Sequence, residues 1–314
     1  MPNTIITTLA ISTTSLLFVA SVSSEGVPVK SEGIPAQVTE VAPLEDVTPS
    51  FIVPAAHFES LELAGETVPM EGFGVMENLD RELIVNTYRH SSTILYLKRA
   101  SRWFPLIERI LEEEGVPDDF KYLAVIESGL SQAVSPAGAR GFWQFMSKTA
   151  PEYGLEVSST VDERYDIEKS TRAACDYLNK SYTKFGSWAL AAASYNMGRA
   201  GVAKRLKEQG VDNYWDLHLN SETGRYVYRL LAVKEVMSSP ESFGFTLSSS
   251  DLYSEYKVRE VTVSENISNL SDFALENGSN LRELKTLNPW LRKGYLNVKL
   301  GKTYSIYFPN TMTE

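Results

Sequence analysis

One glutamate in this chain stands where its surroundings could keep it protonated. Glu127 closes the apolar helical turn Phe-Lys-Tyr-Leu-Ala-Val-Ile-Glu, and a glycine-containing loop follows it. Aromatic side chains then surround a single amide, Gln144, in the run Gly-Phe-Trp-Gln-Phe-Met. Because apolar surroundings disfavour the ionised form of a carboxyl group, they raise its pKa and make it a proton donor at neutral pH. We therefore interpret Glu127 as a candidate general acid.

A second segment supplies polar groups of the kind that recognise sugars. Tyr195 and Asn196 follow an alanine-rich stretch and bring a phenol and another amide. Glycosidases usually place two carboxyl groups at the scissile bond, but the helix before Gln144 offers only Glu127. The next acidic residues lie among polar neighbours, and we interpret them as helix caps and solvated positions: Glu152, Asp162, Glu163 and Asp166.

A site with a single acid must take its nucleophile from the substrate. A 2-acetamido group on the sugar can stabilise the oxocarbenium-like centre, and a hydroxyl of the same sugar can then attack it. Glu127 would give its proton to the leaving oxygen and later accept one from that hydroxyl. This chemistry predicts cleavage of an amide-bearing sugar polymer.

The composition limits the classes of function. The chain has 314 residues and a hydrophobic content of 43%, as globular proteins do, and its net charge of −10 argues against a nucleic-acid binder. A single cysteine, Cys175, excludes an intrachain disulfide and is interpreted as a buried side chain. Three histidines show no metal-ligand spacing, so we expect neither a metal nor another cofactor.

The N-terminus is interpreted as an export signal that covers residues 1–24. Residues 5–20 are mostly apolar, and the small residues after them suit cleavage before Glu25, although the start carries no Lys or Arg. The alternative is an uncleaved anchor, because the apolar stretch is near the shortest length that spans a bilayer. We expect a periplasmic protein, with membrane association as the alternative.

Changes of pattern divide the rest of the chain into four segments. Residues 25–68 are predicted to be a disordered linker, most clearly over the Pro-, Ser- and Thr-rich part at 25–56. Residues 69–243 repeat apolar side chains at three- and four-residue steps, which predicts an almost entirely helical domain. A Ser-rich connector at 244–255 leads to residues 256–310, where a strand, two helices and a strand are expected. The expected helices of the large domain run over 69–96, 96–113, 118–127, 144–153, 168–184, 187–197, 199–209 and 223–238.

Four motifs in this order resemble the catalytic domain of the soluble lytic transglycosylases. They are Glu127-Ser128-Gly129, Gly141 through Met146, Ser194-Tyr195-Asn196 and Arg225-Tyr226-Val227. Their order and spacing are most similar to the membrane-bound murein transglycosylase D subgroup, over roughly residues 80–240. The resemblance implies a mainly α, lysozyme-like fold. It also implies non-hydrolytic cleavage of the bond between MurNAc and GlcNAc, which leaves a 1,6-anhydroMurNAc end.

The same resemblance implies a role for each matching residue. Glu127 is the single general acid and base, and Ser128 helps to position it. The implied substrate-binding residues are Gln144 and Asn196, which hydrogen-bond the sugars, Phe142 and Met146, which line the glycan groove, Tyr195, whose hydroxyl points toward the catalytic carboxylate, and Tyr226 in the same cleft.

Two positions depart from the family pattern, and two others are interpreted as core positions. Phe142 stands where the family often has Leu or Ile, and Ser194 stands where Ala is usual. Neither difference removes a polar group that the mechanism needs. Between the implied groove residues, Trp143 and Phe145 are interpreted as core side chains.

Residues 258–308 resemble a LysM module, a β-α-α-β unit that binds glycans containing N-acetylglucosamine. Val261 to Val263 matches its first strand, and Leu281 to Pro289 matches its second helix and helix end. The loop at 265–268 reads Glu-Asn-Ile-Ser where the family usually has Gly-Asp-Thr-Leu, so both retained and lost glycan binding stay open. Trp290 is interpreted as closing the small core. The predicted fold class is mainly α, with a small C-terminal α+β module.

Three alternatives remain beside the lytic transglycosylase. A hydrolytic muramidase similar to goose-type lysozyme would need a water held by a second polar group. A non-catalytic wall-binding protein would have no use for Glu127, and a helical interaction domain would carry the four motifs by accident. The expected partners are the glycan strands of peptidoglycan and other cell-wall proteins, with no nucleic acid. We expect a monomer.

Overall fold

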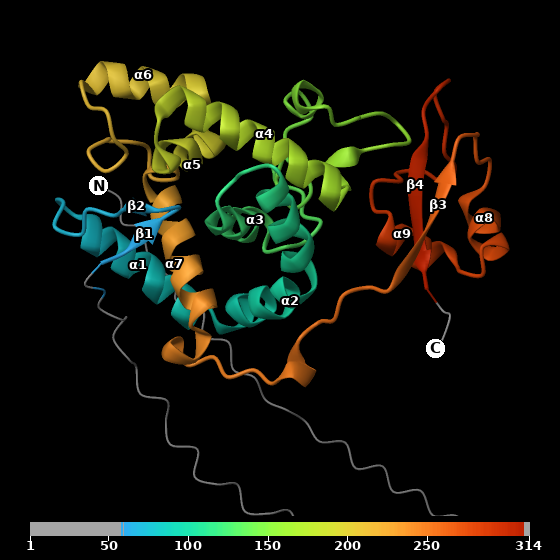
Figure 1. Ribbon diagram of the computed structural model, residues 1–314, viewed down its shortest axis with the longest axis horizontal. Helices are drawn as coiled ribbons and strands as arrows, with labels where there is room; N and C mark the ends of the chain where they lie inside the picture. The colour runs from blue at the N-terminus through green and yellow to red at the C-terminus, as the bar shows by residue number, and fades with distance from the viewer. Residues whose placement is uncertain (1–57, 59, 311–314) are drawn as a thin grey trace, which may run out of the picture. The chain divides into compact units, whose positions relative to one another are not determined.

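The computed structural model describes residue 58 and residues 60–310, and most of them are helical (Figure 1). The predicted signal peptide at 1–24 lies outside the described residues. The described α-helices and strands are β1 Glu62–Leu63, β2 Glu66–Thr67, α1 Val75–Tyr88, α2 His90–Glu113, α3 Lys121–Ser128, α4 Ile167–Phe185, α5 Trp188–Met197, α6 Arg199–Gln209, α7 Tyr226–Ser238, β3 Val258–Val263, α8 Leu270–Glu276, α9 Leu281–Leu287 and β4 Tyr304–Pro309. The predicted class, mainly α with a small C-terminal strand module, is confirmed.

The short antiparallel pair β1–β2 corrects the predicted linker at its C-terminal end. Leu61, Leu63 and Val68 are buried in the core of the helical domain, so this part of residues 25–68 is ordered. The carboxylate of Glu66 also accepts hydrogen bonds from the backbone N–H groups of Trp188 and the next residue, at the start of α5. Three well-spaced apolar side chains therefore outweigh the polar composition around them.

The helical domain is built around a short central helix, α3. It packs against α2 and α7, while α1 lies along α7 and α4 lies along α5 (Figure 1). The seven residues Trp188–Ser194 of α5 are all buried, which fits a helix that is apolar on every side and enclosed by α4, α6 and α7. The core of the domain therefore packs against α3, the helix that carries Glu127.

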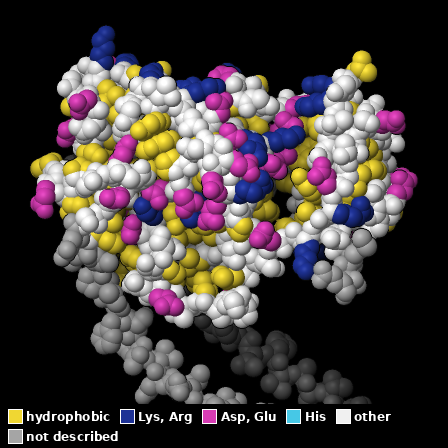
Figure 2. Space-filling model, in the orientation of Figure 1, with side chains coloured by type: hydrophobic (Ala, Val, Ile, Leu, Met, Phe, Trp, Pro, Cys, Tyr) yellow, Lys and Arg dark blue, Asp and Glu magenta, His cyan; other side chains and the backbone are white. Residues whose placement is uncertain are grey.

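Acidic and basic side chains are interspersed over the face of the molecule in Figure 2. Several join neighbouring helices: Arg172 of α4, for example, pairs with Glu113 and Glu114 at the end of α2. Acidic side chains on this face are therefore interspersed with basic ones and do not form one acidic field.

The segment predicted as a helix over 144–153 is mostly irregular. Only Ala150–Tyr153 is helical, as one 3₁₀ turn. Gln144 has φ of 49°, in the left-handed region that an α-helix of L-residues avoids, and Arg140 bridges both Val134 and Phe145. The apolar spacing of this segment comes from a folded loop in which Phe142, Trp143 and Phe145 are buried. The predicted break near Tyr96 also differs, because the chain turns at Arg89 instead.

The C-terminal unit has the expected strand–helix–helix–strand order. β3 and β4 pair antiparallel, with Val261 opposite Ile306 and Val263 opposite Tyr304. Alternate residues of β4 are buried against α8 and α9, as a two-stranded sheet with one covered face requires. Trp290 stacks on Tyr304 in this core, as predicted from the sequence.

Candidate active site

Glu127 lies in the last turn of α3, where a phenol reaches its carboxylate. The hydroxyl of Tyr226, the first residue of α7, donates a hydrogen bond to Oε1 of Glu127. Desolvation by the surrounding protein raises the pKa of the Glu127 carboxyl above its ordinary value. The Tyr226 hydrogen bond and the charge of Arg229 lower this pKa and the charge of Glu222 raises it, but desolvation dominates. The carboxyl therefore has the environment of a proton donor.

The end of α3 is fixed directly behind the carboxylate. Gly129 closes the helix with φ of 62°, and a Cβ there would lie 2.7 Å from the ring of Tyr96, so only glycine fits without a shift. Ser128 donates from Oγ to the carbonyl of Ala124 and accepts from the N–H of Ser131. Ser128 thus joins the helix end to the following loop.

The side chain of Gln144 is held by its own loop. Its Nε2 donates to the carbonyl oxygens of Gly141, at 2.7 Å, and Ala133, at 3.2 Å. Both amide hydrogens are used in these bonds, and Oε1 has no hydrogen-bond partner among the described residues. The half-buried Gln144 can therefore offer an acceptor to a sugar N–H or O–H.

The two tyrosines exchange the places expected from the sequence. Tyr226, not Tyr195, donates to Glu127, whereas the hydroxyl of Tyr195 donates to the carbonyl of Trp143 at 2.8 Å. Burial, with the negative charge of Glu127 next, raises the pKa of both phenols well above its ordinary value, so both stay protonated donors. Sequence spacing could not decide this, because both phenols lie near one carboxylate and only the helix directions assign the bond.

Asn196 is already bonded within the protein. Its Oδ1 accepts from the hydroxyl of Thr223 at 2.7 Å, and its Nδ2 donates to Glu222 at 3.1 Å. These bonds join the end of α5 to the 3₁₀ turn before α7. Glu222 and Arg229 both act electrostatically on Glu127, and neither is predicted as a site residue from the sequence. The only signal was their closeness to the Arg-Tyr-Val motif at 225–227.

The aromatic cluster around Gln144 is more deeply buried than expected at one position. Trp143 and Phe145 are buried, as predicted, and Met146 is 40% exposed. Phe142, predicted to line the glycan groove, is only 2% exposed and packs edge-to-face on Trp103 at 5.5 Å between ring centroids. The reason is that Phe142 packs toward Trp103 of α2 and lines a cavity that Gln144 does not line.

Two of the acidic residues predicted to be solvated are buried. Asp162 and Glu163 are each 3% exposed and pair with Arg164 and Lys169 respectively. Asp162 also caps the 3₁₀ turn at 163–165, and Asp166 caps α4 as predicted. The capping role was visible in the sequence, but burial depends on the C-terminal module, which covers this loop.

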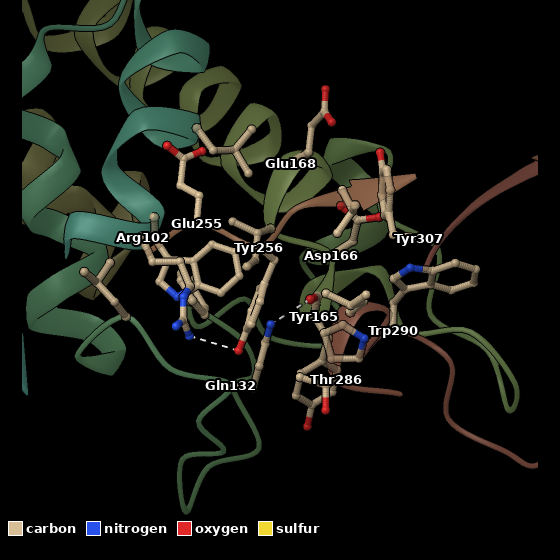
Figure 3. A pocket seen from close by; sticks show the side chains of 18 of the residues that line it. Arg102, Gln132, Tyr165, Asp166, Glu168, Glu255, Tyr256, Thr286, Trp290 and Tyr307 are labelled. Carbon is tan, nitrogen blue, oxygen red and sulfur yellow. Dashed lines mark hydrogen bonds between the residues drawn. The ribbon is translucent and has the colours of Figure 1, made fainter. Parts of the chain in front are cut away.

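Two cavities flank this region. A polar one of about 350 Å³ is lined by Ile126 of α3 and Arg229 of α7, and also by Glu82, Glu222 and Arg225. An apolar one of about 500 Å³ lies where α2 faces the C-terminal module (Figure 3). Its lining residues labelled in Figure 3 include Arg102, Tyr256, Gln132, Trp290 and Tyr307. Glu127 lines neither of these two cavities.

Other kinds of site are not found in the described part of the chain. Residues 58 and 60–310 hold no group of three His, Cys, Asp or Glu side chains placed to bind a metal ion. Cys175 is buried, and burial raises the pKa of its thiol to about 12, so it remains an unreactive thiol at neutral pH. None of the described helices has the length and apolar character that crossing a membrane requires.

Two family models match the chain. Residues 105–217 match the transglycosylase SLT domain, and residues 259–312 match the soluble lytic transglycosylase C-terminal LysM-like domain. The first match contains Glu127, Gln144 and Tyr195, and the second covers the C-terminal unit.

The chain is also similar to curated proteins and to a solved structure. The membrane-bound lytic murein transglycosylase D of Escherichia coli K12 is 27% identical over 220 residues, which are 68% of this chain and 47% of that protein. The protein of the same name from E. coli O6:H1 matches equally. A solved structure of an inactive mutant of the lytic transglycosylase Slt from Pseudomonas aeruginosa has 22% identity and a TM-score of 0.36, over 48% of this chain and 26% of that one. The chain spans about half the length of the curated relatives it matches.

Proposed function

We propose that this chain, which carries a transglycosylase SLT domain followed by the LysM-like domain of soluble lytic transglycosylases, is a lytic transglycosylase that cleaves the glycan strands of murein. The observation that carries the proposal is the desolvated carboxyl of Glu127, with its raised pKa and its bond from Tyr226. A protein that only binds glycan has no need of such a proton donor.

The reaction proposed for this site begins with Glu127 in its protonated form. Because Oε1 accepts the hydrogen bond from Tyr226, Oε2 is the oxygen left to carry the proton toward the substrate. Oε2 gives this proton to the glycosidic oxygen between MurNAc and GlcNAc, and the C1–O4 bond breaks. The 2-acetamido group of MurNAc stabilises the positive charge that develops at C1.

The second step reverses the direction of proton transfer. The Glu127 carboxylate accepts the proton of the MurNAc C6 hydroxyl as that oxygen bonds to C1, which gives a 1,6-anhydroMurNAc end and restores the acid. The hydroxyl of Tyr226 stabilises the carboxylate between the two steps through the same hydrogen bond. The reaction consumes no water and needs no second carboxyl group.

The sugar contacts proposed for the cleft follow from the side-chain groups that are exposed or not fully hydrogen-bonded within the protein. Gln144 offers Oε1 as an acceptor, and Met146, 40% exposed beside it, offers apolar surface. Asn196 has both its oxygen and nitrogen engaged, so we assign it to the support of Glu222 and Thr223, with substrate contact only through its remaining amide hydrogen and lone pair.

A hydrolytic muramidase is the second candidate because of Glu222. This exposed carboxylate acts on the pKa of Glu127 and sits on a turn held by Asn196, so it could hold a water opposite the scissile bond. Hydrolysis would give a reducing MurNAc end where the lytic reaction gives the anhydro end.

The setting proposed for this activity is the periplasm. The apolar stretch at residues 5–20 would direct export, and the LysM-like module would help to hold the enzyme on the glycan. The wall polymer would then be both substrate and partner.

Digestion of purified peptidoglycan tests the proposal. The wild-type protein should release muropeptides with anhydro ends, detected by mass spectrometry, and Glu127→Gln should release none. Reducing-end products that disappear in Glu222→Gln would assign the hydrolytic reaction instead. If neither the wild type nor Glu127→Gln gives products but both sediment with the polymer, the protein is a wall binder and the catalytic proposal is wrong.

A further inference from the structure

The C-terminal module is bonded to one loop of the helical domain, residues 155–166. The N–H of Asp162 donates to the carbonyl of Trp290 at 2.9 Å, and the N–H of Arg292 donates to the carbonyl of Thr160 at 2.8 Å. Between them Val161 and Leu291 form a β-bridge. The loop is therefore joined to the module by backbone pairing, which a mobile tether would not show.

Side chains of the same loop complete the core of the module. Val161 and Tyr165 are 0% and 3% exposed and belong to the apolar cluster of the module. The guanidinium of Arg292 lies over the Tyr165 ring at 4.1 Å, and Glu156 accepts hydrogen bonds from Lys302 and Tyr304. Without the module, these apolar side chains would lie in water.

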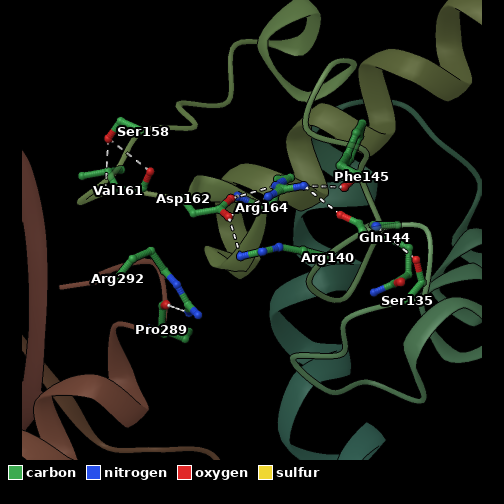
Figure 4. A network of polar contacts seen from close by, with 12 residues as sticks. Ser135, Arg140, Gln144, Phe145, Ser158, Val161, Asp162, Arg164, Pro289 and Arg292 are labelled. Carbon is green, nitrogen blue, oxygen red and sulfur yellow. Dashed lines mark hydrogen bonds and ion pairs between the residues drawn. The ribbon is translucent and has the colours of Figure 1, made fainter.

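The loop also carries a buried ion pair that faces the other way, toward Gln144. Arg164 and Asp162 are each 3% exposed, and the guanidinium binds the carboxylate with two parallel bonds, at 2.8 Å from Nε and 2.7 Å from Nη2 (Figure 4). The remaining terminal nitrogen, Nη1, donates to the carbonyl of Gly138 at 3.2 Å and to that of Phe145 at 3.3 Å. These two carbonyls bracket the loop that holds Gln144.

The conformation of that loop needs support from outside. Gln144 is in the left-handed region with φ of 49°, which is costly for a residue with a side chain. The backbone at Gly141 lies so close to the carbonyl of Arg164 that a Cβ would come within 1.9 Å. Arg164 thus contacts the Gln144 loop through its side chain and its backbone.

From these contacts we infer that Arg164 is a positioning residue for the candidate active site. Together with Asp162 it connects the seat of the C-terminal module, residues 160–162, to the loop that aims Gln144 at the substrate. The docked module therefore helps to fix the conformation of that loop, in addition to any binding of glycan. This inference rests on the proposed function only in what Gln144 does; the coupling itself is a property of the resting protein.

The test uses hydrogen exchange of the full chain, because it needs no activity. Arg164→Lys keeps the charge but cannot form the fork to Asp162 and reach both carbonyls. We expect the amides of residues 138–145 to exchange at least about threefold faster, while those of α6 stay unchanged. Arg172→Lys, which alters an ion pair between α2 and α4, is the matched control and should leave residues 138–145 unchanged.

A second pair of variants tests the connection from the module side. Val161→Ala and Val263→Ala remove the same two methyl groups from the same core, but only Val161 belongs to the seat. Val161→Ala should accelerate exchange at 138–145, and Val263→Ala should leave it unchanged. This pair remains informative if Arg164→Lys does not fold. Unchanged exchange at 138–145 in Val161→Ala, or equal acceleration in both valine variants, would overturn the inference.

Kinetics separate positioning from a general loss of stability. With soluble glycan strands, Arg164→Lys should lower kcat/KM about tenfold, mainly through a higher KM, because a misplaced Gln144 weakens substrate binding. The pH at which kcat falls should not move, since Glu127 is untouched. A fall in kcat alone with a shifted pH profile would overturn the assignment of Arg164 to Gln144. If the wild type cleaves nothing, the proposed function fails, and the exchange experiment still decides the coupling.

Discussion

At the scale of single residues, the site depends on a half-buried carboxyl group that the surrounding protein partly desolvates. The desolvation of Glu127 disfavours its ionised form, and the hydrogen bond from Tyr226 partly offsets this. One helix end and one phenol on another helix therefore set the proton affinity of the candidate acid. Changes to either group should appear in the pH dependence of the activity and of the stability.

Removing the phenolic donor should move the pH profile upward. The bond from Tyr226 lowers the pKa of Glu127, so Tyr226→Phe should raise that pKa further. Since Glu127 must be protonated for the first step, the alkaline limb of kcat should shift to higher pH while kcat at its maximum falls about tenfold. Tyr195→Phe is the control, because its hydroxyl bonds the Trp143 carbonyl instead. An alkaline limb that stays in place would show that Tyr226 does not act on the reactive carboxyl.

Replacing the acid itself should stabilise the protein near neutral pH. A carboxyl whose pKa is raised on folding contributes stability that is fully present below its unfolded pKa of about 4.3 and is lost as the pH rises through the folded pKa. Glu127→Gln removes this loss of stability, which is about 1.4 kcal/mol for each unit by which folding raises the pKa. Urea unfolding at pH 4 and pH 7 measures it: the advantage of Glu127→Gln should be larger at pH 7. An equal advantage at both values would contradict the raised pKa.

At the scale of elements, an ion pair joins α1 to the residue before α7, beside the site. Glu82 of α1 is 1% exposed, and its carboxylate accepts from Nε of Arg225 at 2.6 Å and from Nη2 at 3.1 Å. Arg225 directly precedes Tyr226, so this pair fixes the start of the helix that presents the phenol to Glu127.

Breaking this ion pair from the arginine side should be costly. Arg225→Ala leaves the Glu82 carboxylate buried without its partner, which should lower the free energy of unfolding by about 2 kcal/mol, less than for a fully buried pair because Arg225 is partly exposed. Chemical denaturation compares it with Arg205→Ala, whose ion pair with Glu208 in α6 is exposed and should contribute less than about 0.5 kcal/mol. Equal losses in the two variants would rule out a structural role for the Glu82 pair.

The accuracy of the sequence-based prediction differs between the helices and the irregular loop around Gln144. The spacing of apolar residues places α4 to α7 within a few residues of their observed limits, because each buries one continuous face or is enclosed on all sides. The same spacing wrongly predicted a helix around Gln144. Apolar side chains there reach the core from a loop in which Gln144 itself has the left-handed conformation. The bond to Glu127 was predicted for the wrong tyrosine, and Phe142 was predicted for the wrong cavity, since local patterns do not encode how distant helices cross.

At the scale of the whole molecule, the connector between the helical domain and the C-terminal module does not mark the boundary between their two hydrophobic cores. The sequence places a connector at 244–255 and treats the module as a separate unit. The loop at 155–166 nevertheless contributes Val161 and Tyr165 to the core of the module. No pattern in that loop distinguishes a side chain that faces its own domain from one that faces another.

This shared core predicts that the full chain unfolds in a single step. Loss of the module would expose Val161 and break the backbone bonds of Asp162 to Trp290 and of Arg292 to Thr160, so the module should not melt independently in the calorimeter. Val161→Asp places a charge in that core and should separate a module transition at least about 10 °C below the main one. Val134→Asp is the matched control, because Val134 is 57% exposed and its substitution should leave one transition. Two transitions in the wild-type protein would mean that the contacts at 160–162 do not couple the two parts, and the module would then act on the active site only by holding the glycan.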